Sequence, residues 1–156
     1  MAHILTGKDE LLGRWAAAKI PAIGDVKFFG EFKAVGVTTG TEANDRLLAV
    51  CVYHDYQPKY ATCQISFASA DPRWVSRQTV RALLSVPFLQ YRVNKVWVAI
   101  PHTSERTIRL VKKLGFKQEA ILYGHFGRGI NAVICRMFAA GYEYGYWSKP
   151  KIAKAA

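Results

Sequence analysis

The sequence lacks any long hydrophobic run. No uninterrupted apolar stretch reaches the roughly 18 residues that a membrane-spanning helix needs. Residues 1–10 also lack the basic start and the apolar stretch of a signal peptide. We therefore expect neither a membrane protein nor a secreted precursor, and we predict a cytoplasmic location.

Cysteine is also scarce. The three cysteines, Cys51, Cys63 and Cys135, are an odd number in apolar, strand-like surroundings. None of the short Cys/His spacings of a zinc site surrounds them. This pattern favours a reducing compartment and predicts no structural metal.

Acidic residues are half as numerous as basic ones, at 11 against 22, which gives a formal net charge of +11. Such a charge attracts nucleic acid, anionic cofactors or acidic proteins, and it does not choose among them. Aromatic residues stand beside basic ones at Arg73-Trp74, at Tyr91-Arg92 and within residues 142–147. A nucleic-acid-binding protein therefore stays open as an alternative, although no recognised nucleic-acid motif accompanies these pairs.

The 156 residues are enough for one continuous core. We predict a single domain over residues 1–147 and a basic, disordered tail over residues 148–156. Hydrophobic periodicity predicts helices at residues 9–20, 75–89 and 104–114, and strands at residues 28–37, 47–54, 60–68, 95–100, 117–123 and 131–139. This order predicts an α+β fold, with helices on both faces of a mixed sheet. The strands at residues 60–68 and 95–100 are expected to be parallel or splayed, because one helix joins them.

Two local patterns predict details of this layout. In the first helix, Leu11, Leu12, Trp15 and Ala16 or Ala18 are expected on the buried side, and Pro21 ends the helix.

The second pattern is the polar turn at residues 55–58, which predicts a hairpin. If Tyr53 pairs with Ala61, then Cys51 faces Cys63 across the ladder. We interpret both thiols as reduced core cysteines, since nothing nearby marks a lowered thiol pKa.

The helix at residues 104–114 has the clearest local signals in the chain. Ser104 is a natural N-cap, and Ile108, Val111 and Leu114 form an apolar stripe. Gly115 follows, where a left-handed residue can end a helix.

Residues 104–116, SERTIRLVKKLGF, together with residues 117–120 and a strand ending in Arg136-Met137, resemble the second half of GNAT N-acetyltransferases. The likeness covers about residues 47–140. The sequence is similar in particular to the branch that acetylates ribosomal-protein N-termini and to phage-borne acetyltransferases. The resemblance to the phage-borne enzymes also includes residues 71–74 and Pro87-Phe88.

This resemblance implies a GNAT-like, mostly antiparallel central sheet and an acetyl-CoA-dependent N-acetyltransferase. The acceptor would be the amine of a protein N-terminus, a lysine or a small molecule. The protein would be a monomer or a homodimer and, if a phage encodes it, would act in the host cytoplasm.

The resemblance also implies a cofactor site at the loop and first turn of the second helix. Most family members have glycines there, whereas this chain has DPRWVS at residues 71–76. Guanidinium groups and the hydroxyl of Ser76 would then hold the pyrophosphate. With Arg81, the residues Arg73 and Arg77 are expected to form one basic stripe, which could equally be a solvated helix face. The predicted cofactor contacts are Ile65, Ser66, Phe67, Arg73, Trp74, Val75, Ser76, Arg77, Ser104, Arg106 and Phe116.

For catalysis, the resemblance implies that a neutral amine attacks the thioester directly. A backbone N–H near residues 65–68 would polarise the thioester carbonyl. The predicted catalytic residues are Thr107, whose hydroxyl would face the thiol, Ser104, where relatives often have Asn, and His54 as the base. Asp55, Glu31 and Glu119 are further candidates for the base.

A non-catalytic function stays open as an alternative to the acetyltransferase. Val111 occupies the position where many family members carry the tyrosine that protonates the CoA thiolate, and the loop at residues 71–76 lacks glycine. A GNAT-fold binding protein or virion-associated protein would also show these two changes.

Overall fold

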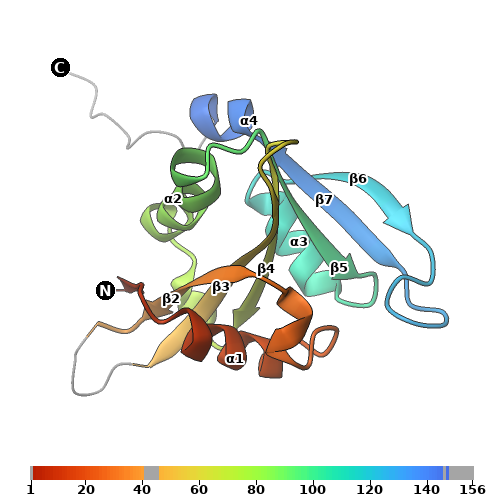
Figure 1. Cartoon of the computed structure of the whole chain (residues 1–156), viewed down its shortest axis with the longest axis horizontal. Coiled ribbons are helices and arrows are strands. Elements are labelled where there is room, and N and C mark those ends of the chain that lie inside the picture. The colour runs from red at the N-terminus through yellow and green to blue at the C-terminus, as the bar shows by residue number, and fades with distance from the viewer. Residues whose placement is uncertain (1, 41–45, 146, 148–156) are drawn as a thin grey trace.

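The computed structural model describes residues 2–40, 46–145 and 147. The fold is built on a seven-stranded sheet with the order β1-β2-β3-β4-β5-β7-β6 (Figure 1). The strands are β1 (His3–Leu5), β2 (Phe32–Thr38), β3 (Leu47–Gln57), β4 (Thr62–Ser69), β5 (Lys95–Pro101), β6 (Lys117–Leu122) and β7 (Ala132–Phe138). β4 and β5 pair in parallel, and the other neighbouring strands pair antiparallel. The predicted α+β class and mostly antiparallel sheet are confirmed.

Helices cover both faces of this sheet, as predicted (Figure 1). The helices are α1 (Asp9–Lys19), α2 (Arg77–Ser85), α3 (Glu105–Lys113) and α4 (Ala139–Tyr144). Side chains alternate between the two faces along a strand. Val50 and Val52 of β3 therefore pack with α1, whereas Cys51 and Tyr53 pack with α2 and α3. In the part of the chain that the structure describes, none of the helices is long and apolar enough to span a membrane.

The parallel strands β4 and β5 diverge after a short stretch of pairing. Their register joins Thr62 to Lys95 and ends where Gln64 lies opposite Trp97. Beyond this point β4 continues beside β3 as far as Ser69, and β5 continues beside β7 as far as Pro101. Each strand thus follows a different neighbour, and the sheet opens between them (Figure 1). The strands are both parallel and splayed, so this prediction is confirmed.

The predicted register of the hairpin is wrong. β3 runs on to Gln57, which pairs with Thr62, so the turn lies at residues 58–61. An irregularity between His54 and Gln57, with Asp55 at a φ of 48°, shifts the ladder. Cys51 therefore faces Phe67 and not Cys63. Both thiols are buried and reduced, as interpreted, and burial raises the pKa of each to about 12.

The second helix begins later than predicted. Residues Pro72–Trp74 form a separate 3₁₀ turn, because the Asp71 carboxylate accepts a hydrogen bond from the Arg73 backbone N–H. Val75 and Ser76 are extended, and the Ser76 hydroxyl caps α2 by accepting the Thr79 backbone N–H. Arg73 therefore lies in the turn before α2, and Arg77 and Arg81 lie on α2 four residues apart.

Some of the other predictions about the helices are confirmed by the structure, and others are wrong. Ser104 occupies the N-cap position of α3 as predicted, but its side chain makes no capping hydrogen bond. Gly115 has a φ of 103° and ends α3 in the predicted left-handed conformation. Leu11, expected on the buried side of α1, is 61% exposed, since the helix turns Gly13 toward the Phe32 ring instead.

Two of the C-terminal aromatic residues pack back on the domain, whereas Tyr144 is exposed. Tyr142 and Trp147 are buried in the core cluster on the α2 and α3 face. The predicted tail at residues 148–156 lies outside the described residues.

Candidate active site

A cleft of about 930 Å³ occupies the opening between β4 and β5. Its walls are residues 65–70 from β4 and the segment after it, residues 98–101 from β5, and the start of α3. Lys19 at the end of α1, the following residues 20–22, and the β6–β7 loop residues Phe126 and Ile130 close one side. The cleft thus joins segments that are far apart in the sequence.

The backbone of β4 faces this cleft at alternate residues. The Ala70 N–H donates to the Leu48 carbonyl. Because backbone groups alternate in direction along a strand, the N–H and C=O groups of the even-numbered residues of β4 point toward β3. The peptide groups of Ile65 and Phe67 therefore point toward β5, beyond the place where the β4–β5 ladder ends. Two residues of the predicted carbonyl-polarising segment thus present backbone groups to the opening.

His54 and Ser66 form a polar pair on the α1 face of the sheet. His54 Nε2 lies 2.8 Å from Ser66 Oγ, and Ser66 lines the cleft. The imidazole is 6% exposed and packs on the Phe29 ring, so it is buried and not the solvent-facing hairpin residue that the sequence pattern allowed. Burial lowers the pKa of His54 to about 4, although the charge of Asp55 opposes this shift. His54 is therefore neutral near pH 7 and can reach the cleft through the Ser66 hydroxyl.

The start of α3 supplies three of the predicted site residues. Ser104, Arg106 and Thr107 all line the cleft. Ser104 and Thr107 are half-buried, and Arg106 is exposed. The structure thus brings Thr107 to the same opening as the β4 backbone.

The loop before α2 is only partly in contact with the cleft. Asp71 and Pro72 line it, whereas Arg73, Val75, Ser76 and Arg77 lie outside its walls. The Arg73 guanidinium is bound by the Asp71 carboxylate, with its Nη2 2.6 Å from Oδ2. Hydrogen bonds and the charge of Arg73 lower the pKa of Asp71 to about 2.

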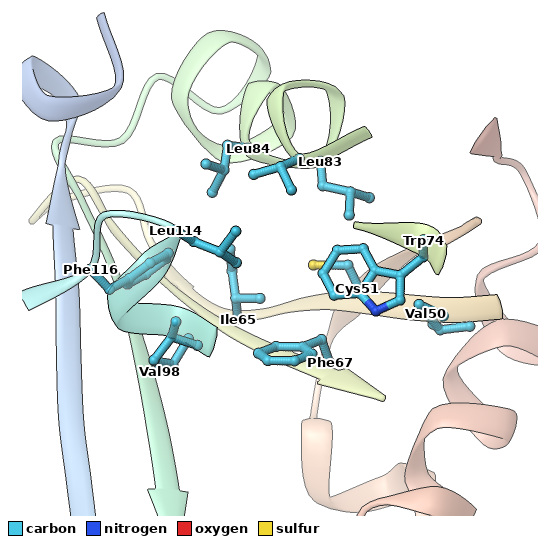
Figure 2. A pocket seen from close by; sticks show the side chains of 13 residues that line it. Val50, Cys51, Ile65, Phe67, Trp74, Leu83, Leu84, Val98, Leu114 and Phe116 are labelled. Atoms are coloured by element: carbon cyan, nitrogen blue, oxygen red, sulfur yellow. The ribbon is translucent and has the colours of Figure 1, made fainter. Parts of the chain in front are cut away.

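An apolar cavity of about 40 Å³ lies behind the cleft, between the sheet and helices α2 and α3 (Figure 2). Trp74 and Phe116, two predicted cofactor contacts, lie in its wall and not in the wall of the cleft. The indole N–H of Trp74 donates to Ser69 Oγ at 2.9 Å, which fixes the ring in the core. Ile65, Phe67 and Val98 line both the cavity and the cleft.

The other predicted candidates for the base lie elsewhere. Glu31 and Asp55 are exposed and do not line the cleft. Glu119 forms ion pairs with Lys95 and Arg136, at 2.7 Å and 3.8 Å. Among the candidates, only His54 is connected to the cleft by a hydrogen bond.

Sequence reasoning missed the closing side of the cleft. Residues 19–22 span the end of the helix predicted at residues 9–20, and Phe126 and Ile130 lie between the strands predicted at residues 117–123 and 131–139. The Gly-rich composition of residues 124–129 marks a loop, but no pattern in the chain indicates that it lies over the cleft.

Solved structures with the same fold include the spermidine/spermine N-acetyltransferase SpeG from Vibrio cholerae in complex with manganese ions. It aligns with 92% of this chain and 95% of its own, with a TM-score of 0.66 and 11% identity. A dodecameric structure of the V. cholerae spermidine N-acetyltransferase covers 74% of this chain and 70% of its own, with a TM-score of 0.61 and 14% identity. The predicted GNAT-like fold is thus confirmed. No protein-family model matches the sequence, and the comparison with curated proteins also finds no match.

Proposed function

We propose that the protein is an acetyl-CoA-dependent N-acetyltransferase. The observation that carries this proposal is the divergence of β4 and β5 after Gln64 and Trp97, which opens a cleft beside the Ile65 and Phe67 peptide groups. The opening lies in a fold shared with known N-acetyltransferases. A further argument is that the proposed catalytic groups Thr107 and Ser66 lie in the walls of this same cleft.

The donor's pantetheine arm would lie along β4, where peptide groups are available for hydrogen bonds. Its pyrophosphate would bind at the N-terminus of α2, where helix N–H groups and the dipole favour an anion. Arg77 is the first residue of α2, and Arg106 of α3 lines the cleft, so both would supply positive charge to the bound donor. Arg73 is already bound by Asp71, and Ser76 already caps α2, so we assign both a supporting role.

The donor supplies a thioester whose acyl carbon the amine attacks. The Ile65 or Phe67 N–H would donate to the carbonyl oxygen as negative charge develops on it. The amine nitrogen forms a bond to the acyl carbon, and the carbon–sulfur bond breaks. The Thr107 hydroxyl would give its proton to the departing thiolate and regain one from solvent.

The His54–Ser66 pair would accept the proton that the amine loses. Ser66 is the member that lines the cleft, and the neutral imidazole of His54 behind it can receive a proton through the serine hydroxyl. A pKa of about 4 makes His54 a weak base at pH 7. The acceptor amine should therefore be neutral when it attacks.

The charges around the cleft bear on the acceptor. Of the described residues that line it, the charged ones are Lys19, Arg106 and Asp71, and Asp71 is already paired with Arg73. A polyamine would meet net positive charge there. An amine that carries an acidic group, such as an acidic protein N-terminus, fits better.

Thermal unfolding with and without acetyl-CoA tests this function. A ligand that binds only the folded state adds about 2.7 kcal/mol of stability at a hundredfold excess over its Kd. We expect Arg77→Glu to abolish the shift. The control Arg14→Glu, which changes an exposed arginine on α1, should keep it. If millimolar acetyl-CoA causes no shift in the unmodified protein, the proposed function is wrong and a non-catalytic role is favoured.

A further inference from the structure

The apolar cavity behind the cleft is placed to receive part of a ligand. It shares Ile65, Phe67 and Val98 with the cleft, so the two spaces adjoin at these residues. In Figure 2, Phe67 and Val98 lie on one side of the cavity, and Leu83 and Leu84 of α2 lie on the other. The cavity therefore continues the cleft toward α2.

The walls of the cavity are unsuited to water. They consist of aliphatic and aromatic side chains together with the Cys51 thiol, whose pKa burial raises to about 12. The Trp74 N–H, a polar group at the wall, is already bonded to Ser69. A buried water needs two to four polar partners, whereas an apolar cavity stays dry and binds apolar ligands. The lining thus favours hydrocarbon.

The volume limits how much hydrocarbon can enter. An engineered apolar cavity of about 150 Å³ holds the six carbons of benzene. The cavity here is about 40 Å³. By this ratio it has room for about two carbon atoms.

We propose that this cavity receives the end of the donor's acyl chain, so that the preferred donor is a propionyl or butyryl thioester of CoA. The proposal rests on the proposed function. Ile65 and Phe67 are the residues whose peptide groups face the expected thioester carbonyl, and their side chains line the cavity. An acyl chain that extends from that carbonyl past Phe67 and Val98 enters the cavity. The reaction is the same transfer, in which the carbon–nitrogen bond forms, the carbon–sulfur bond breaks and the thiolate is protonated.

The test measures the Kd of CoA, acetyl-CoA, propionyl-CoA, butyryl-CoA and hexanoyl-CoA by titration calorimetry. Each methylene that enters should tighten binding about fourfold, from the transfer free energy of one methylene group. We expect affinity to rise from acetyl to butyryl and to fall at hexanoyl, whose chain exceeds the cavity.

Ala49→Val provides the matched variant, because Ala49 lines the cavity from β3 and does not line the cleft. Two added carbons should fill the space and remove the preference for butyryl-CoA while acetyl-CoA still binds. The control is Ala34→Val, the same change at a buried position on the other face of the sheet. It should keep the preference. Leu84→Ala enlarges the cavity, and it should move the optimum to hexanoyl-CoA.

The outcomes separate the two proposals. If CoA and every thioester fail to bind, the proposed function fails and this inference fails with it. If CoA binds but affinity does not change with chain length, or if Ala49→Val keeps the butyryl preference, the acyl-chain proposal alone is overturned. If a variant unfolds, the comparison of Kd across the acyl chain lengths on the unmodified protein is enough to decide the proposal.

Discussion

The hydroxyl of Tyr53 on β3 donates a hydrogen bond of 2.7 Å to the backbone carbonyl of Leu83 in α2. In a regular helix this carbonyl would accept from the N–H four residues later, but that residue is Pro87, which has none. The chain continues there as a π-helix over Val86–Gln90. Tyr53 thus donates to a carbonyl that Pro87 leaves without its usual partner four residues later, and it ties the sheet to the helix beside the apolar cavity.

Removing this hydroxyl should destabilise the protein. In Tyr53→Phe the buried Leu83 carbonyl loses its donor, which costs about 1–3 kcal/mol of unfolding free energy. Tyr56→Phe is the control, because the Tyr56 hydroxyl makes only a long contact of 3.4 Å at the surface. It should stay within about 0.5 kcal/mol of the unmodified protein. Denaturant unfolding measures both variants, and equal stabilities would contradict this role of Tyr53.

His54 should make stability depend on pH. Its pKa is about 4 in the folded protein, below the ordinary value of 6.5, because burial disfavours the charged ring. Between these two values the unfolded chain binds a proton that the folded protein does not, so stability is lost as pH falls from 6.5 to 4. The loss is about 3 kcal/mol, from 1.36 kcal/mol per pKa unit.

His54→Gln keeps a polar side chain beside Ser66 and cannot titrate. The difference in unfolding free energy between the unmodified protein and this variant should therefore shrink as pH falls from 6.5 to 4. A difference that does not change with pH would show that His54 titrates with its ordinary pKa.

Thr107 should affect turnover more than donor binding. Thr107→Val keeps the shape of the side chain but removes the proposed proton donor, so kcat should fall on the order of 10²-fold. The Kd of acetyl-CoA should change little. Thr6→Val, at an exposed position before α1, is the control and should leave kcat unchanged. An unchanged kcat in Thr107→Val would exclude the hydroxyl as the acid.

The charge of the cleft predicts the acceptor class. A peptide with an acidic sequence after its free N-terminus should have a kcat/KM more than about tenfold above that of spermidine, because like charges at an interface cost several kcal/mol. Lys19 lies on the closing side of the cleft. Lys19→Glu should lower kcat/KM for the acidic peptide and leave the Kd of acetyl-CoA unchanged. Faster acetylation of spermidine would refute this assignment.

Local sequence signals predicted those parts of the fold that depend on local interactions. The C-terminal end of α3 follows from Gly115, which acts within one turn of the helix, and α3 begins after Ser104 as predicted. The hairpin register could not be predicted, because the irregularity after His54 depends on how β3 and β4 pair over their whole length.

The residues of the candidate site likewise divide into those that the sequence predicted and those that depend on tertiary packing. Ser66 and Thr107 were predicted from the resemblance, and the structure places both in the cleft wall. Lys19 and Phe126 were missed, because only tertiary packing brings them to the opening between β4 and β5.

Hydrogen exchange with and without acetyl-CoA tests most directly whether the splay between β4 and β5 binds the donor. At a donor concentration of about a hundred times its Kd, we expect slower exchange of the amides at residues 65–71 and 100–107, which line or adjoin the cleft. Exchange in β6 (Lys117–Leu122), which does not line the cleft, should not change. Protection of residues 65–71 is the result that this account predicts, and unchanged exchange at both cleft segments would contradict it.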